Sequence, residues 1–200
     1  MNAAVIDIET TNLAAVGAGI VIVVCIRPTA TQRTRVFRLD QYDLKPSDEF
    51  GIVEREETKM LQEVNDEIRK YYFLIGHNIR KFDVPYLRSR AFQRQVAWTA
   101  RPVMYDTLHA FRRTGYLTQP NGFGKPSAGL DMVADFGKVI QEKTRIYPNE
   151  WWETIWGNKR KRVEAMDKIV DHCQRDVRLN ANVLPFLWEA DVRPVFARSL

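Results

Sequence analysis

Short apolar runs dominate the first forty residues of the chain. Residues 3–9 (AAVIDIE), 20–26 and 35–39 are rich in Val and Ile, and glycine or proline punctuates the segments between them. Runs of this length and composition are typical of buried β-strands. We predict that these three segments are strands and that they form a meander.

The period of the apolar positions changes further along the chain. Met60, Leu61, Val64 and Ile68 recur at helical spacing, which predicts an amphipathic helix. The predicted helices cover residues 54–71, 82–92, 107–113, 130–136 and 160–189, the last bent or broken near Pro185. Short strands are predicted at residues 72–75 and 103–105, and loops at residues 40–50 and 117–129, whereas residues 140–156 favour neither state. Strands precede the helices that cover them, so we expect one mixed sheet in an α/β or α+β domain.

Chain length and net charge limit the number of domains and the kind of partner that we expect. The chain has 200 residues, no internal repeat and no linker-like segment, so we predict a single domain over residues 1–200. The formal net charge is +5, which favours a polyanionic partner such as nucleic acid. The apolar stretch 14–26 is too short for a membrane-spanning helix.

The cysteines and the N-terminus indicate a cellular compartment. Cys25 and Cys173 are the two cysteines and form no CxxC pair, which argues against a zinc ribbon or a disulfide framework. No basic segment precedes an apolar run at the N-terminus, as it would in a secretory signal. We therefore expect a cytoplasmic, intracellular protein with reduced thiols and no membrane association.

Acidic side chains interrupt the first apolar strand. Asp7 and Glu9 are two residues apart, so their side chains share one face of a strand. Two carboxylates among β-branched neighbours are unfavourable unless a positive group lies between them. A divalent cation meets that need, because Mg²⁺ prefers oxygen ligands. The alternative is an exposed strand end at which both acids are solvated.

Two further polar groups follow later in the chain. Asn78 comes after an apolar run, and Phe82 and Asp83 follow it four and five residues later. His172 and Asp176 are four residues apart on the predicted final helix, so they share a face. Taken singly, Asp83 is also explained as a helix cap, and His172 with Asp176 as a surface pair.

In chain order these motifs resemble those of the DEDD superfamily of 3′→5′ exonucleases, which have a ribonuclease H-like fold. The resemblance covers most of the chain and includes Thr10, Asp106-Thr107 and the helix at 130–136. It implies an α/β domain in which a mixed central sheet is flanked by helices. It also implies two divalent metal ions, Mg²⁺ or Mn²⁺, held by Asp7, Glu9, Asp83 and Asp176. Two ions about 3.5–4 Å apart stabilise the attacking and leaving oxygens of a phosphodiester.

The residue that positions the attacking water divides this superfamily. One branch has Tyr four residues before the final Asp, and the other has His five residues before it. Here His172 lies four residues before Asp176, within HCQRDV, which otherwise resembles the tyrosine branch. We hypothesise that His172 orients or deprotonates the water, because imidazole exchanges a proton near neutral pH. The alternative is that His172 is a bystander and the metal alone activates the water.

In similar exonucleases, residues after the first motif contact the terminal nucleotide, and the candidates here are Thr10 and Leu13. Asn78 and Phe82 are expected to shape the floor of the cleft, and the alternative for Phe82 is a place in the core. Asn12 stands where glycine is common in similar enzymes. Basic residues at 80–94 and 159–162 are candidates for phosphate contacts. Trp151, Trp152 and Trp156 would either stack on bases or pack the final helix on the sheet.

We therefore predict a metal-dependent 3′→5′ exonuclease that acts on nucleic acid with a free 3′ end. Single-stranded DNA is the favoured substrate and RNA is an open alternative, because no 2′-hydroxyl contact is readable from the sequence. A separate polymerase is a candidate partner. Two other functions compete: a catalytically silent ribonuclease H-like binding module and a structure-specific endonuclease on the same fold. The intact set of four carboxylates argues against the silent module.

Overall fold

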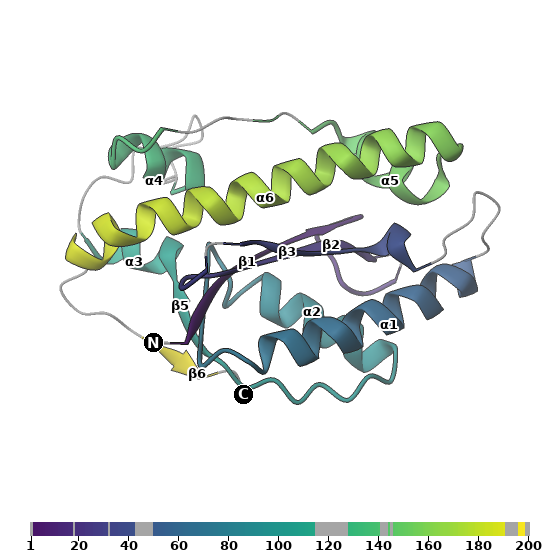
Figure 1. The fold of residues 1–200 in the computed structure, drawn as a ribbon, viewed down its shortest axis with the longest axis horizontal. Coiled ribbons are helices and arrows are strands. Elements are labelled where there is room, and N and C mark those ends of the chain that lie inside the picture. The colour runs from purple at the N-terminus through teal and green to yellow at the C-terminus, as the bar shows by residue number, and fades with distance from the viewer. Residues whose placement is uncertain are drawn as a thin grey trace.

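A twisted mixed sheet between two layers of helices forms the protein, as the computed structural model shows (Figure 1). The structure describes residues 2–17, 19–31, 33–42, 50–114, 128–140, 144, 146–190 and 196–198. Its strands are β1 (Ala3–Thr10), β2 (Val21–Pro28), β3 (Arg35–Arg38), β4 (Phe73–Gly76), β5 (Val103–Asp106) and β6 (Ala197–Arg198). Its helices are η1 (Leu39–Gln41), α1 (Phe50–Ile68), α2 (Asp83–Gln93), α3 (Thr107–Arg113), α4 (Leu130–Phe136), α5 (Pro148–Trp156) and α6 (Lys159–Ala190).

The strand order in the described part of the chain is β3-β2-β1-β4-β5-β6. β1, β2 and β3 form the predicted antiparallel meander, whereas β4 lies parallel to β1 and β5 lies parallel to β4. The short strand β6 closes the other edge, antiparallel to β5. The prediction of a mixed central sheet flanked by helices is therefore confirmed.

Helices cover both faces of the central strands. α6 crosses one face with α4 and α5 beside it, and α1 and α2 lie against the other face (Figure 1). Consecutive residues of β2 from Val21 to Ile26 are fully buried, as expected for a strand covered on both sides. On α6, Met166, Ile169, Cys173 and Val177 are fully buried at helical spacing and form the stripe that packs on β1 and β2. Among the described residues, none of the helices has the length and apolar character needed to cross a membrane.

Several boundaries differ from the sequence predictions. α1 begins four residues before the predicted position, and residues 148–156, which favoured neither state, form α5. The predicted break near Pro185 is wrong, because α6 continues through it to Ala190. Proline removes one backbone donor, but Val183 and Leu187 on either side are fully buried, and their packing offsets that loss. Most of the two predicted loops lies outside the described residues.

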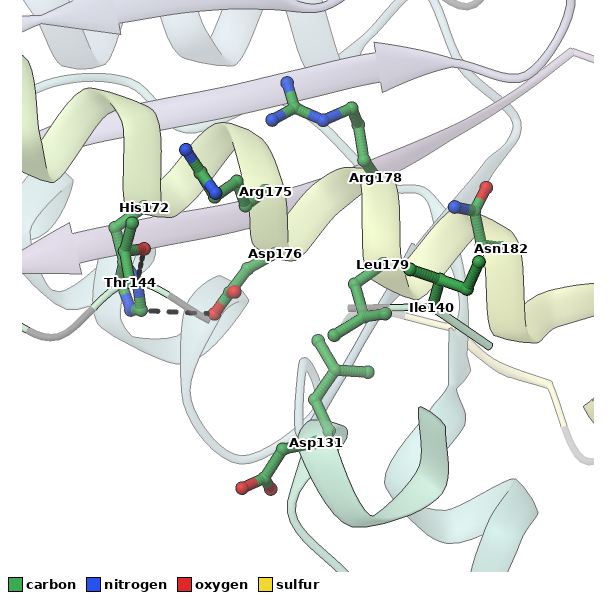
Figure 2. A pocket seen from close by; sticks show the side chains of 10 residues that line it. Asp131, Ile140, Thr144, His172, Arg175, Asp176, Arg178, Leu179 and Asn182 are labelled. Atoms are coloured by element: carbon green, nitrogen blue, oxygen red, sulfur yellow. Dashed lines mark hydrogen bonds and ion pairs between the residues drawn. The ribbon is translucent and has the colours of Figure 1, made fainter. Parts of the chain in front are cut away.

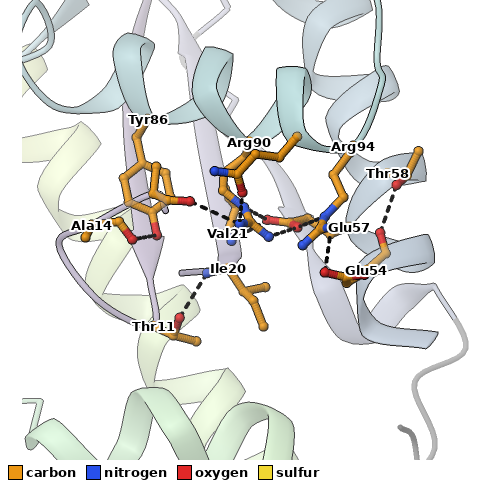
Figure 3. Close-up of polar contacts among 12 residues, drawn as sticks. Thr11, Ala14, Ile20, Val21, Glu54, Glu57, Thr58, Tyr86, Arg90 and Arg94 are labelled. Atoms are coloured by element: carbon orange, nitrogen blue, oxygen red, sulfur yellow. Dashed lines mark hydrogen bonds and ion pairs between the residues drawn. The ribbon is translucent and has the colours of Figure 1, made fainter. Parts of the chain in front are cut away.

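A buried ion-pair network joins α1, α2, β2 and the segment after β1 (Figure 3). Arg90 and Glu57 are both fully buried, and the guanidinium meets the carboxylate in two bonds, at 2.9 and 2.5 Å. Glu57 also accepts hydrogen bonds from Arg94 Nε and from the backbone N–H of Val21, both at 2.9 Å. Arg90 Nη1 donates to the carbonyl oxygen of Ala15 at 3.0 Å. The network therefore fixes where the chain runs as it leaves β1.

We predict that Arg90→Met destabilises the protein by about 3–5 kcal/mol, because it leaves Glu57 buried with its main partner removed. The measurement is urea unfolding followed by circular dichroism. The matched control is Arg69→Met, which breaks an exposed ion pair with Asp66 at 3.6 Å and should cost less than about 1 kcal/mol. Equal effects of the two substitutions would contradict the structural role of Arg90.

Candidate active site

Asp7 and Glu9 lie on the face of β1 that α6 covers. In the antiparallel register Asp7 is opposite Cys25, and Glu9 is opposite Val23. The thiol of Cys173 on α6 donates to the backbone oxygen of Asp7 at 3.4 Å, and Trp151 Nε1 on α5 donates to Glu9 Oε2 at 2.9 Å. Both acids are partly buried. The solvated strand end considered from the sequence therefore does not describe them.

Asp83 reaches the same region from the other side of β1. It is the first residue of α2 and is buried. The segment before it is held by the carboxylate of Asp106 at the end of β5, which accepts hydrogen bonds from the backbone N–H groups of Asn78 and Arg80 at 3.1 and 3.2 Å. Asn78 adopts a φ of 64°, a left-handed conformation that asparagine tolerates better than most residues. Asp106 thus shapes the turn that delivers Asp83 to the site.

His172 and Asp176 complete the group from α6. His172 Nε2 lies 3.7 Å from Glu9 Oε1 and 3.8 Å from Asp176 Oδ2. Its other ring nitrogen, Nδ1, lies 2.9 Å from the hydroxyl oxygen of Thr144, and Figure 2 shows His172 between Thr144 and Asp176. His172 is therefore oriented by a hydroxyl on one side and faces two of the predicted metal ligands on the other.

Burial disfavours the charged form of every carboxyl group in this cluster. It raises the pKa of Glu9 to about 8 and that of Asp83 to about 7. It also raises the pKa of Asp7 well above its usual value, with repulsion from Glu9, Asp83 and Asp176 adding to the effect. Burial raises the pKa of Asp176 too, although neighbouring His172 acts in the opposite direction. A cation held among these carboxyl groups would lower their pKa values, because a nearby positive charge favours the ionised form.

The oxygen donors of this cluster are of the kind that a divalent cation prefers. Asp7 Oδ2 is buried and has no hydrogen-bond partner within the described part of the chain. Such an orphaned oxygen among carboxylates has the chemistry and the burial that a hard cation requires. In their described positions, however, no three His, Cys, Asp or Glu side chains are arranged closely enough to form a metal-binding group. The donors therefore have the chemistry of a divalent-ion site. In their described positions, however, they are not already arranged as ligands around a single point.

A cleft opens beside the carboxylates, along α6 and between it and α4. Its volume is about 420 Å³. Figure 2 shows side chains from these helices around it, with Asp131 opposite Asp176. It is lined by Leu130, Asp131, Ile140, Thr144, His172, Arg175, Asp176, Arg178, Leu179 and Asn182. The mixture of apolar, cationic and amide groups would suit the bases and phosphates of a nucleic acid strand.

The four predicted substrate contacts lie in two places. Thr10 is buried and donates to the backbone oxygen of Asn12 at 2.7 Å, whereas Leu13 is 86% exposed. Asn12 caps its own turn, since its side-chain oxygen accepts from the N–H of Ala14 at 2.7 Å.

The other two predicted contacts, Asn78 and Phe82, are partly buried near Asp83. The ring of Phe82 packs on Tyr86 with 5.5 Å between centroids. This places Phe82 against the main core, and its contact with substrate stays a prediction, as do the other three.

Several basic residues proposed as phosphate contacts have other partners. Arg90 is fully buried against Glu57, and Arg94 pairs with Glu54 at 2.6 Å, so neither is available to a phosphate backbone. Of the two alternatives for the tryptophans, packing in the core holds for Trp151, which lies against the main core. Its indole N–H also donates to Glu9, a contact that neither alternative included.

The contacts of Trp151 and Thr144 with predicted site residues could not be read from the sequence. Their partners, Glu9 and His172, lie 142 and 28 residues away, and no local pattern signals such contacts. Asp106 was noted only as part of the resemblance. Its position between a strand and a helix, typical of an N-cap, was the available signal, and its side chain does cap α3 through Leu108 and His109.

Comparisons with known proteins identify the family and the fold of the chain. A family model described as DNA polymerase family B, exonuclease domain, matches residues 1–112. Among solved structures, the family B DNA polymerase of the hyperthermophilic archaeon Pyrobaculum calidifontis is similar, with a TM-score of 0.59 and 19% sequence identity over 96% of this chain. The match covers 26% of that polymerase, and it confirms the predicted ribonuclease H-like fold. The search of curated proteins finds no match.

We predict that the metal-free protein loses stability as the pH rises from about 4 to about 8. The folded pKa values of Glu9 and Asp83, about 8 and about 7, lie above those of the unfolded chain. The folded state therefore binds more protons across this interval, and its stability falls with rising pH. Thermal unfolding in EDTA would measure this.

A substitution provides the control for that prediction. Asp7→Asn removes one charge from the cluster and should flatten the pH dependence, whereas Asp66→Asn, at an exposed position, should leave it unchanged. A melting temperature that rises between pH 5 and pH 8 would contradict the raised pKa values of Glu9 and Asp83 in the folded protein.

Proposed function

This chain belongs to the exonuclease-domain family of DNA polymerase family B, and from that premise we propose that it is a metal-dependent 3′→5′ exonuclease. The observation that carries the proposal is that Asp7, on β1, lies close enough to Glu9, Asp83 and Asp176 for each of them to oppose its ionisation, although these acids come from three separate elements. A structural role does not require four such carboxyl groups beside a cleft that Asp176 lines. A cation-binding catalytic role does.

Asp7, Glu9, Asp83 and Asp176 would hold two divalent ions, Mg²⁺ or Mn²⁺. When bound, such ions lower the pKa of an attacking water and stabilise the charge that develops on phosphodiester oxygens. Asp7 interacts with all three other acids, so it would contribute to holding both ions. The remaining carboxylates would fix where the positive charge that attracts the phosphate resides.

His172 is proposed to hold the attacking water. Its Nε2 faces the space between Glu9 and Asp176, where it can accept a proton from water or orient it. Thr144 supports this assignment, since its hydroxyl bonds to Nδ1 at 2.9 Å and so limits rotation of the ring. His172 would thus position the attacking water, the role that the resemblance assigns to a tyrosine at this spacing.

The proposed substrate is a nucleic acid strand with a free 3′ end, single-stranded DNA in preference to RNA. The family description supports DNA, because it refers to domains of DNA polymerases. The cleft beside Asp176 would receive the strand. Removal of misincorporated nucleotides for a polymerase is the corresponding physiological role.

The test is digestion of a 5′-labelled DNA oligonucleotide in Mg²⁺ or Mn²⁺. We expect products shortened one nucleotide at a time, abolition by EDTA, and a loss of more than about a hundredfold in rate for Asp7→Asn. Asp66→Asn, an exposed carboxylate-to-amide change, is the matched control and should retain full activity. Internal cuts would indicate an endonuclease, and an undegraded strand would indicate a silent binding module.

We predict that His172→Ala lowers kcat by about 10²-fold and removes the acidic limb of the pH–rate profile, because the group that accepts or orients a proton is lost. Thr144→Val should have a smaller effect with the limb retained, since the imidazole remains but is less firmly held. Rates measured from pH 5 to pH 9 would show this. A profile for His172→Ala that matches the unmutated protein would leave the histidine as a bystander.

A further inference from the structure

One carboxylate of the cluster has a partner that is neither acidic nor basic. Trp151 Nε1 donates to Glu9 Oε2 at 2.9 Å. The other oxygen, Glu9 Oε1, faces His172 Nε2 at 3.7 Å. An indole has one N–H donor and no acceptor, so it can hold one oxygen of a carboxylate without competing for the other.

The position of Trp151 is fixed independently of Glu9. Its backbone oxygen accepts from the hydroxyl of Thr154, a fully buried residue, at 2.6 Å. One residue earlier, buried Glu150 pairs with Lys168 of α6 at 2.6 Å and caps the start of α5 through the N–H of Tyr147 at 2.8 Å. α5 is thereby tied to α6, and the ring of Trp151 packs against the main core.

We propose that Trp151 is a positioning residue for Glu9. By holding Oε2 it keeps the side chain directed into the cluster, against the repulsion of Asp83 and Asp176, and leaves Oε1 as the oxygen offered to a divalent cation. This role rests on the proposed function. It means that α5 contacts a predicted metal ligand, Glu9, although α5 carries no predicted metal ligand itself. Trp151 acts through Glu9 and does not contact the substrate.

A hydrogen bond to an ionised carboxylate is stronger than one between neutral groups. Partners of this kind orient metal ligands, and their removal typically lowers metal affinity or activity by about 10–100-fold. Trp151→Phe keeps an aromatic ring in the core and removes the donor together with the five-membered ring of the indole. Trp152→Phe is the matched control, because Trp152 is 37% exposed and has no hydrogen bond to the cluster in the described part of the chain.

The experiment is calorimetric titration of the full chain with Mn²⁺, without substrate. We expect Trp151→Phe to weaken Mn²⁺ binding by about tenfold and Trp152→Phe to leave it unchanged. The effect should vanish in a Glu9→Ala background, which removes the acceptor through which Trp151 acts. Equal affinities for the two tryptophan variants, or an undiminished effect beside Glu9→Ala, would overturn the role of Trp151 and leave the proposed function standing.

A spectroscopic measurement on the unmutated protein tests the same role and does not require that a Trp151 variant folds. In the unmutated protein labelled with ¹⁵N, the indole N–H resonance of Trp151 should shift as Mg²⁺ is added, and that of Trp152 should not. A Trp151 resonance that does not move while the protein binds Mg²⁺ and degrades DNA would reject the positioning role. A protein that binds neither Mg²⁺ nor Mn²⁺ and leaves the labelled strand intact would reject the proposed function itself, and the role of Trp151 with it.

Discussion

Repulsion among four carboxyl groups is the constraint around which this domain is organised. Asp7 lies where β1, α2 and α6 converge, and burial there opposes its ionisation. A protein without a use for cations would gain stability by replacing any one of these acids. Their retention in the core requires a scaffold that can tolerate the repulsion, and the surrounding elements are bonded accordingly.

Two of the acids are secured by neighbours outside the cluster. Asp106 holds the turn that leads to Asp83, and Trp151 holds Glu9. Arg90 ties the chain after β1 to α2 through Ala15. The positions of Asp83 and Glu9 therefore depend on bonds from other elements as well as on their own helix or strand.

The sequence disclosed the parts of this arrangement that follow from short-range geometry. Two residues on a strand share a face, so Asp7 and Glu9 were recognisable as a pair, and the spacing of four placed His172 beside Asp176 on a helix. The mixed sheet followed from apolar runs that precede helical periodicity. Trp151 and Arg90 could not be assigned in the same way, because their partners lie on distant elements and both residues also suit a surface or a core position.

The 32-residue helix α6 both packs on the sheet and carries residues that face the cleft. The stripe that packs on the sheet, with Cys173 and Val177, alternates with the residues that face the cleft, His172 and Asp176. Inserting one residue between His172 and Asp176 would turn the part of the helix after the insertion by about 100° relative to the part before it, so Asp176 and Val177 could not both keep their present directions relative to His172 and Cys173. The packing of the stripe on the sheet thus sets the direction in which His172 and Asp176 point, and natural variation in this helix should conserve its phase more strictly than its composition.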